Sequence, residues 1–225
     1  MDDRFAGWLL ALAIGATLVA AARRAGRPEA FGAAALLLLY MVVLAMTEWL
    51  SPAWRPYAPA VAAAAVWLAV QPLLGLGRLR RDDIGLAPPR PGSLPPALAV
   101  TGLALAANAA VILMRSTGPV AVPPVWIVAV IVSAIVEEFV LRGVILALAD
   151  RALPPRWTLW GARIGTGGLL VTGAFIALHG VRPGLLLGVA PAAMLYLWLR
   201  ARTGSLLPPM LAHILWNLSV VLLNR

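Results

Sequence analysis

Residues 132–145 read VSAIVEEFVLRGVI, and they place three charged side chains in an otherwise apolar segment. The charged residues are Glu137, Glu138 and Arg142. A charged side chain near the centre of a bilayer costs about 2.5–3.5 kcal/mol on insertion scales, so such residues normally face protein or water and have a function. This stretch therefore predicts a membrane helix whose polar side chains form an internal site.

The composition of the whole chain also indicates a membrane protein. Of its 225 residues, 62% are apolar and 12% are charged, whereas soluble domains average about 45–50% apolar and about 25% charged residues. Several apolar runs approach the roughly 20 residues that cross a bilayer as a helix. The sequence contains no cysteine, which excludes disulfides, cysteine-ligated metals and thiol nucleophiles. We expect an all-α, polytopic membrane helical bundle.

The apolar runs predict about eight transmembrane helices. They cover residues 5–22, 30–50, 58–76, 97–114, 125–149, 164–179, 184–199 and 209–223. The first run follows Asp2 and Asp3, whereas a secretory signal peptide would begin with basic residues, so we expect a spanning helix there. The polar stretch 78–96 is expected to separate an N-terminal three-helix membrane segment, residues 1–77, from a five-helix core, residues 78–225, within one integrated membrane domain.

The formal net charge of +9 comes from arginine, because the chain has no lysine. The distribution of these arginines predicts how the protein is oriented in the membrane. Twelve arginines lie in the first, third, fifth and seventh loops: Arg23, Arg24, Arg27, Arg78, Arg80, Arg81, Arg90, Arg151, Arg156, Arg163, Arg200 and Arg202. Five lie at the termini or in the even-numbered loops: Arg4, Arg55, Arg115, Arg182 and Arg225. Because positively charged loops stay cytoplasmic, both termini are expected on the extracytoplasmic side of what we expect to be a bacterial cytoplasmic membrane. The short basic loops predict contacts with anionic lipid headgroups rather than with nucleic acid.

The two adjacent glutamates are expected to have different roles. Consecutive residues of a helix point about 100° apart, so Glu137 and Glu138 face different surroundings. Glu138 and Arg142 are four residues apart with the acid nearer the N-terminus, which is the favoured order for a helical ion pair. That pairing leaves Glu137 without a partner on its own helix, and an unpaired carboxylate suits a general base.

The only two histidines add to this site. His179 lies in FIALH and His213 in HILWN, both within predicted spans. Asn217 follows His213 by four residues and shares its helix face, and Phe175 stands in the same relation to His179. Together with Glu137, these residues offer a base, two imidazoles and an amide donor, which suffice to activate water and to stabilise an oxyanion. We expect them to converge on one cavity that opens toward the cytoplasm or toward lipid.

Each of these residues also has a purely structural reading. Glu138 and Arg142 could form a buried structural pair, and an intramembrane histidine often serves as a hydrogen bonder between helices. Asn108 in the fourth span is expected to form such an interhelical hydrogen bond. The functional reading is favoured because both histidines and both of these glutamates fall in the last four spans.

Three motifs in this order resemble a known family. EEFVLR fits EExxxR, FIALH fits FxxxH and HILWN fits HxxxN, on successive predicted helices. The chain thus resembles the CPBP family of intramembrane proteases, also called the CAAX protease and bacteriocin-processing (Abi) family. The similarity extends over residues 81–217, including RRDDIGLAPPR and RARTGSLLPPM.

The resemblance implies an intramembrane endopeptidase, with a membrane protein or lipidated peptide as substrate. It implies that Glu137 activates water and that His179 assists it. It also implies that His213 and Asn217 stabilise the oxyanion. Glu138 and Arg142 would support the site.

The metal content stays open at this point. Zinc or another divalent metal could be held by Glu137, His179 and His213, but the chain lacks an HExxH pair and a metal-independent mechanism is equally consistent. Two other functions also stay open. One is an ion- or proton-coupled transporter in which Glu137 and the histidines relay protons, and the other is an inactive immunity or scaffold protein on the same fold.

Overall fold

The computed structural model describes residues 3–50, 52–76, 78–115 and 122–223. Its helical elements are α1 (Asp3–Ala25), α2 (Glu29–Leu50), the 3-10 helix η1 (Pro52–Tyr57), α3 (Ala58–Gly75), α4 (Leu94–Arg115), α5 (Pro124–Glu137), the π-helix η2 (Glu138–Ile145), α6 (Leu146–Ala152), α7 (Thr166–His179), α8 (Pro183–Thr203) and α9 (Leu207–Leu223). Two short strands, β1 (Trp157–Leu159) and β2 (Ala162–Ile164), precede α7. The predicted all-α bundle is confirmed, with this hairpin as a small addition.

The lengths and composition of the helices fit a multi-pass membrane protein. Within the described residues, five segments are long and apolar enough to cross a bilayer: Glu29–Thr47, Ala58–Gly75, Leu94–Arg115, Pro124–Ala152 and Pro183–Thr203. The fourth of these is a single rod made of α5, η2 and α6. Three shorter apolar helices accompany them: Phe5–Ala21, Thr166–His179 and Leu207–Leu223. The chain is therefore an integral membrane protein.

The predicted start of the sixth span at residue 164 is wrong. Ile164 ends strand β2, which pairs antiparallel with β1 around the two-residue turn of Trp160 and Gly161. Both turn residues have positive φ, at 46° and 75°, as the tight turns of β-hairpins require. The Trp198 indole donates a hydrogen bond of 3.2 Å to the Leu159 carbonyl and thereby fastens the hairpin to α8.

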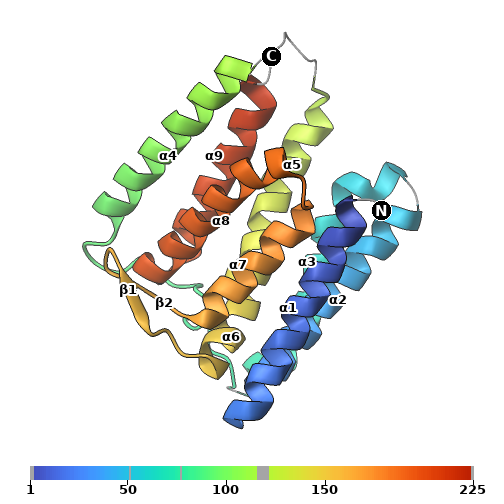
Figure 1. Ribbon diagram of the computed structural model, residues 1–225, viewed down its shortest axis with the longest axis vertical. Coiled ribbons are helices and arrows are strands. Elements are labelled where there is room, and N and C mark those ends of the chain that lie inside the picture. Colours follow the sequence, from blue (N-terminus) through green and yellow to red (C-terminus); the bar gives the residue numbers. More distant parts are fainter. Residues whose placement is uncertain (1–2, 51, 77, 116–121, 224–225) are drawn as a thin grey trace.

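Both ends of the described chain lie at the same, upper ends of the helices in Figure 1. The hairpin, α6 and the turn between α8 and α9 lie at the opposite, lower ends. Helix α1 packs against α2 and α7, α2 packs against α3 and α6, and α9 packs against α4, α5 and α8. The two ends of the described chain therefore lie on the same side of the bundle, and the side of the membrane that they face stays a prediction.

A hydrophobic core joins α1, α2 and α3 to the rest of the bundle. It contains Leu37 and Tyr40 from α2, Leu141 from η2 and Tyr196 from α8. Close backbone approach is needed where α1 meets α7, because a side chain on Gly7 would collide with the Ala177 carbonyl. Helices α1, α2 and α3 thus share a core with the helices that follow them.

The orientation of the bundle can be tested by cysteine labelling, which is clean because the native chain has no cysteine. Arg81 is exposed in the loop before α4, and Pro123 is exposed at the other end of the bundle, just before α5. We expect a membrane-impermeant maleimide to label Pro123→Cys from outside intact cells and to reach Arg81→Cys only after permeabilisation, because basic loops stay cytoplasmic. The reverse pattern would show that the bundle has the opposite orientation.

Candidate active site

Glu137 ends α5 and has one carboxylate oxygen without a hydrogen-bond partner among the described residues. Ser133, one turn earlier, donates a hydrogen bond to Oε1. The other oxygen, Oε2, is buried and lies 3.9 Å from Nε2 of His179. This oxygen has the position and the free lone pairs that a general base needs.

His179 ends α7, and its ring is held in one tautomer. Its Nδ1 lies 2.8 Å from the Phe175 carbonyl oxygen, which can only accept a hydrogen bond, so Nδ1 donates. A neutral His179 therefore presents Nε2 as an acceptor toward Glu137. The Phe175 ring walls the imidazole, with ring centroids 4.4 Å apart. At 3.9 Å, Glu137 Oε2 and His179 Nε2 are close enough for one water molecule to contact both.

Glu138 and Arg142 form the ion pair that the spacing predicts. The Glu138 Oε1 atom lies 3.2 Å from Arg142 NH1, and both side chains are almost completely buried, at 0% and 1% exposure. The Arg142 guanidinium also lies over the Phe175 ring, 4.0 Å from its centroid, which is a cation–π contact. The pair sits within the π-helix η2, an element that is rare and often found at functional sites.

His213 contacts Glu138 rather than Glu137. Its Nδ1 lies 3.0 Å from Glu138 Oε1, and the side chain is 3% exposed. Tyr196 of α8 stacks on the imidazole at 4.6 Å between ring centroids and 21° between planes. Glu138 Oε1 thus contacts both Arg142 on its own helix and His213 on α9. Nε2 of His213 remains available for other contacts.

The predicted single cavity is divided in two. A cavity of about 360 Å³ is lined by His179, His213 and Asn217, together with Phe175 and Tyr196. A smaller cavity of about 140 Å³ is lined by Glu137, His179, Phe175 and Tyr40. His179 and Phe175 line both cavities, so these two side chains form the wall between the glutamate and the α9 residues.

A lateral groove adjoins the larger cavity. It has a volume of about 700 Å³ and lies between α4, α8 and α9. Asn108, Gly188 and Trp216 line both the groove and the larger cavity, so the two spaces are neighbours. The predicted interhelical role of Asn108 is confirmed, because its amide donates a hydrogen bond of 2.8 Å to Ser219 Oγ.

Three residues near this site were missed from the sequence. Ser133 could have been found, because it precedes Glu137 by four residues. Tyr40 of α2 lines the smaller cavity and Tyr196 stacks on His213. Neither tyrosine has a spacing relation to the motifs, so the sequence contains no signal for them.

A metal ion does not fit the proposed ligands Glu137, His179 and His213 as they are arranged. Within the part of the chain that the structure describes, no three histidine, aspartate or glutamate side chains form a group that could hold a metal ion. His213 lines a different cavity from Glu137, beyond the wall formed by His179 and Phe175. The three side chains therefore do not surround one common point.

The contacts of the two glutamates predict that only the loss of Glu138 lowers stability. We expect Glu138→Gln to lower the free energy of unfolding by about 3–5 kcal/mol, because Arg142 would remain buried without its counter-charge. Glu137→Gln is the matched control and should leave the thermal midpoint in detergent close to wild type, because Glu137 pairs with no arginine. Equal losses in the two variants would contradict this division of roles.

The comparisons with known proteins agree with the three motifs. A family model described as type II CAAX prenyl endopeptidase Rce1-like matches residues 119–219. The match contains Glu137, Glu138, Arg142, His179, His213 and Asn217. No curated protein and no solved structure matches the chain. Residues 119–219 are thus similar to the Rce1-like type II CAAX prenyl endopeptidases, which is consistent with the CAAX protease resemblance of the three motifs.

Proposed function

We propose that the protein is an intramembrane endopeptidase that hydrolyses a peptide bond with a water molecule activated by Glu137. The observation that carries this proposal is the contrast between the two glutamates. In both glutamates Oε2 has no hydrogen-bond partner among the described residues, but Oε1 of Glu138 is paired with Arg142 and His213. Glu137 has no such cationic pair, and its Oε2 lies 3.9 Å from the acceptor nitrogen of His179. A bound carboxylate supports a site, and a free one can take a proton.

The first step is addition of water to the scissile carbonyl carbon. Glu137 Oε2 takes one proton from the water as the water oxygen forms its bond to carbon, and Nε2 of His179 orients the water. Ser133 keeps the other carboxylate oxygen of Glu137 in place. The proton then passes from Glu137 to the amide nitrogen, the C–N bond breaks, and the amine leaves.

The larger cavity supplies the groups for the substrate carbonyl. Asn217 lines this cavity and has a side-chain amide that can donate a hydrogen bond. His213 also lines it, and because its Nδ1 contacts Glu138, its Nε2 is the ring nitrogen left for the substrate. Because His179 and Phe175 separate this cavity from Glu137, the reacting carbonyl must lie at the edge of that wall. Donors placed at the developing oxyanion are usually the largest single contribution to acyl-transfer catalysis.

The substrate is proposed to be a membrane protein or a lipidated peptide. The groove between α4, α8 and α9 adjoins the larger cavity, and its lining is mainly apolar. An apolar groove on the outside of a membrane bundle suits a chain or lipid group that arrives from the bilayer. The proposed setting is a bacterial cytoplasmic membrane with both termini outside, where the short basic loops meet anionic lipid headgroups.

The proposed base predicts a loss of cleavage without a loss of fold. We expect Glu137→Gln to lower the cleavage rate by about 10²–10⁴, the usual effect of removing a general base. Purified wild-type and variant proteins would be incubated with a membrane-peptide library, and cleaved products would be identified by mass spectrometry. The thermal midpoint serves as the control for folding.

Two outcomes would contradict the protease. Unchanged cleavage by Glu137→Gln would remove Glu137 as the base. A wild-type protein that cleaves no peptide, but moves protons across liposome membranes, would favour the carrier, in which Glu137 and His179 form a relay.

The groove predicts a second effect on activity. Gly188 faces open space and lines both the groove and the larger cavity, so Gly188→Phe should block the passage between them without reaching the cavity of Glu137. We expect kcat/KM to fall by about tenfold or more, which corresponds to roughly 1.4 kcal/mol of lost transition-state stabilisation. Gly102→Phe on α4 is the matched control, because Gly102 also faces open space but does not line the groove. Equal activity of the two variants would show that substrates take another route.

A further inference from the structure

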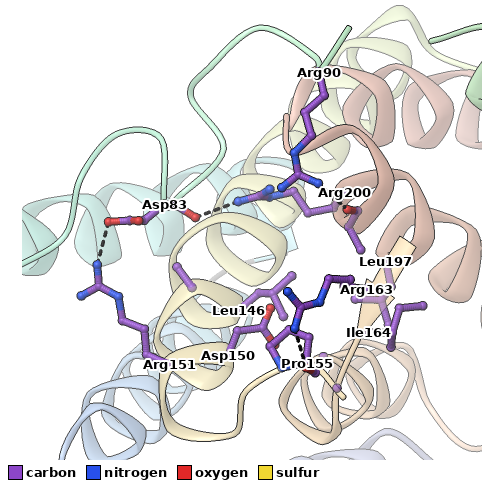
Figure 2. A pocket seen from close by; sticks show the side chains of 14 residues that line it. Asp83, Arg90, Leu146, Asp150, Arg151, Pro155, Arg163, Ile164, Leu197 and Arg200 are labelled. Carbon is purple, nitrogen blue, oxygen red and sulfur yellow. Dashed lines mark hydrogen bonds and ion pairs between the residues drawn. The ribbon is translucent and has the colours of Figure 1, made fainter. Parts of the chain in front are cut away.

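A second polar pocket lies at the end of the bundle opposite the two termini. Its volume is about 360 Å³, and α6, β2, the end of α8 and the loop before α4 surround it. Its charged lining residues are Asp83, Arg90, Asp150, Arg151, Arg163 and Arg200 (Figure 2). None of the residues that line this pocket lines the two cavities around Glu137 and His213, so the pocket is a separate site.

The charges in this pocket do not balance. Asp83 already forms an ion pair with Arg151, with 2.6 Å between Asp83 Oδ2 and Arg151 NH2. Three guanidinium groups, those of Arg90, Arg163 and Arg200, then share the pocket with one carboxylate, that of Asp150. Like charges brought together in a partly desolvated pocket repel one another, so an anion bound between them would be stabilised.

Arg200 is held firmly, whereas Arg90 and Arg163 have donors to spare. Arg200 donates from Nε to the Arg142 carbonyl at 3.2 Å and from NH2 to the Asp83 carbonyl at 2.7 Å. Arg90 donates a hydrogen bond of 3.3 Å to the Ala201 carbonyl, and Arg163 donates one of 3.4 Å to the Pro155 carbonyl. A guanidinium has five N–H donors, so these two side chains can turn several toward a ligand.

Asp150 gives an independent sign that the pocket is built for a ligand. Its Oδ1 atom is buried and has no hydrogen-bond partner among the described residues. Figure 2 shows the Asp150 side chain in the pocket beside Arg163. A buried acceptor without a partner is costly, and a ligand that carries an O–H or N–H group next to its negative charge would satisfy it.

We propose that this pocket binds a phosphate group, with Arg90, Arg163 and Arg200 as its ligands and Asp150 accepting a hydrogen bond from the same molecule. Arginines bind phosphate with paired, charge-assisted hydrogen bonds. A tetrahedral phosphate can also be contacted from three directions at once, which matches guanidinium groups that come from a loop, a strand and a helix.

The position of the pocket suits a lipid headgroup. The end of α8 and the hairpin mark the lower ends of the helices in Figure 1, where lipid phosphates meet the protein surface. A free phosphate ion offers the same chemistry, so the two sources are separated by experiment. In either case the ligand would contact Arg200, which donates to the Arg142 carbonyl, and would thereby brace the π-helix η2.

The test uses purified, delipidated protein in a neutral detergent, titrated separately with short-chain phosphatidylglycerol and with inorganic phosphate. Short-chain diacylglycerol is the acyl control, because it has the same chains but no phosphate. We expect phosphatidylglycerol to bind saturably and to raise the thermal midpoint. The double variant Arg90→Gln/Arg163→Gln should raise Kd by about tenfold or more, because it removes two charge-assisted contacts.

Arg156→Gln is the matched charge control, since Arg156 is exposed in the same connection as Arg163 but does not line the pocket. We expect this variant to bind within about twofold of wild type, as exposed charges contribute little. Binding of inorganic phosphate in competition with the lipid would assign the site to free phosphate as well, and binding of the lipid alone would assign it to the headgroup.

Three results would overturn the proposal. They are equal affinity for diacylglycerol, wild-type affinity in the double variant, and equal weakening by Arg156→Gln. Because the readout is binding and not cleavage, failure here leaves the protease proposal standing, and failure of the protease leaves this one standing.

Discussion

The burial of the Glu138 carboxylate is the constraint on which the rest of the site depends. A carboxylate that is 0% exposed inside a membrane bundle is tolerable only with a positive partner close by. Arg142 supplies the charge from one turn further along, and His213 supplies a second contact from α9. Arg142 in turn lies over Phe175 of α7, so one buried charge determines how three segments of the bundle meet.

This arrangement also explains why Glu137 is available for chemistry. Arg142 and His213 both contact the neighbouring Glu138, whereas Glu137 faces His179, with 3.9 Å between Oε2 and Nε2. His179 donates a hydrogen bond from Nδ1 to the Phe175 carbonyl, so a neutral His179 offers Glu137 an acceptor rather than a donor. Neither Ser133 nor a neutral His179 neutralises the charge of Glu137, whose Oε2 stays available to a water molecule.

The contacts that the sequence predicted correctly join residues one turn apart on the same helix. The pairs Glu138–Arg142 and Phe175–His179 follow from a spacing of four residues, and both contacts are present. The contact of Glu138 with His213 joins residues 75 positions apart, and no periodicity specifies which helix faces which. The hairpin before α7 was missed because its turn is Trp-Gly, not one of the usual asparagine or aspartate turns.

Residues that precede the family match also line the cavity of Glu137 and the basic pocket. Tyr40 on α2 lines the cavity of Glu137, and Asp83 and Arg90, in the loop before α4, line the basic pocket, yet all three precede residue 119. The loop reaches η2 through Arg200, whose guanidinium donates to both the Asp83 and the Arg142 carbonyls. The motifs therefore supply Glu137, His179 and His213, while the preceding segments complete the lining of the Glu137 cavity and of the basic pocket.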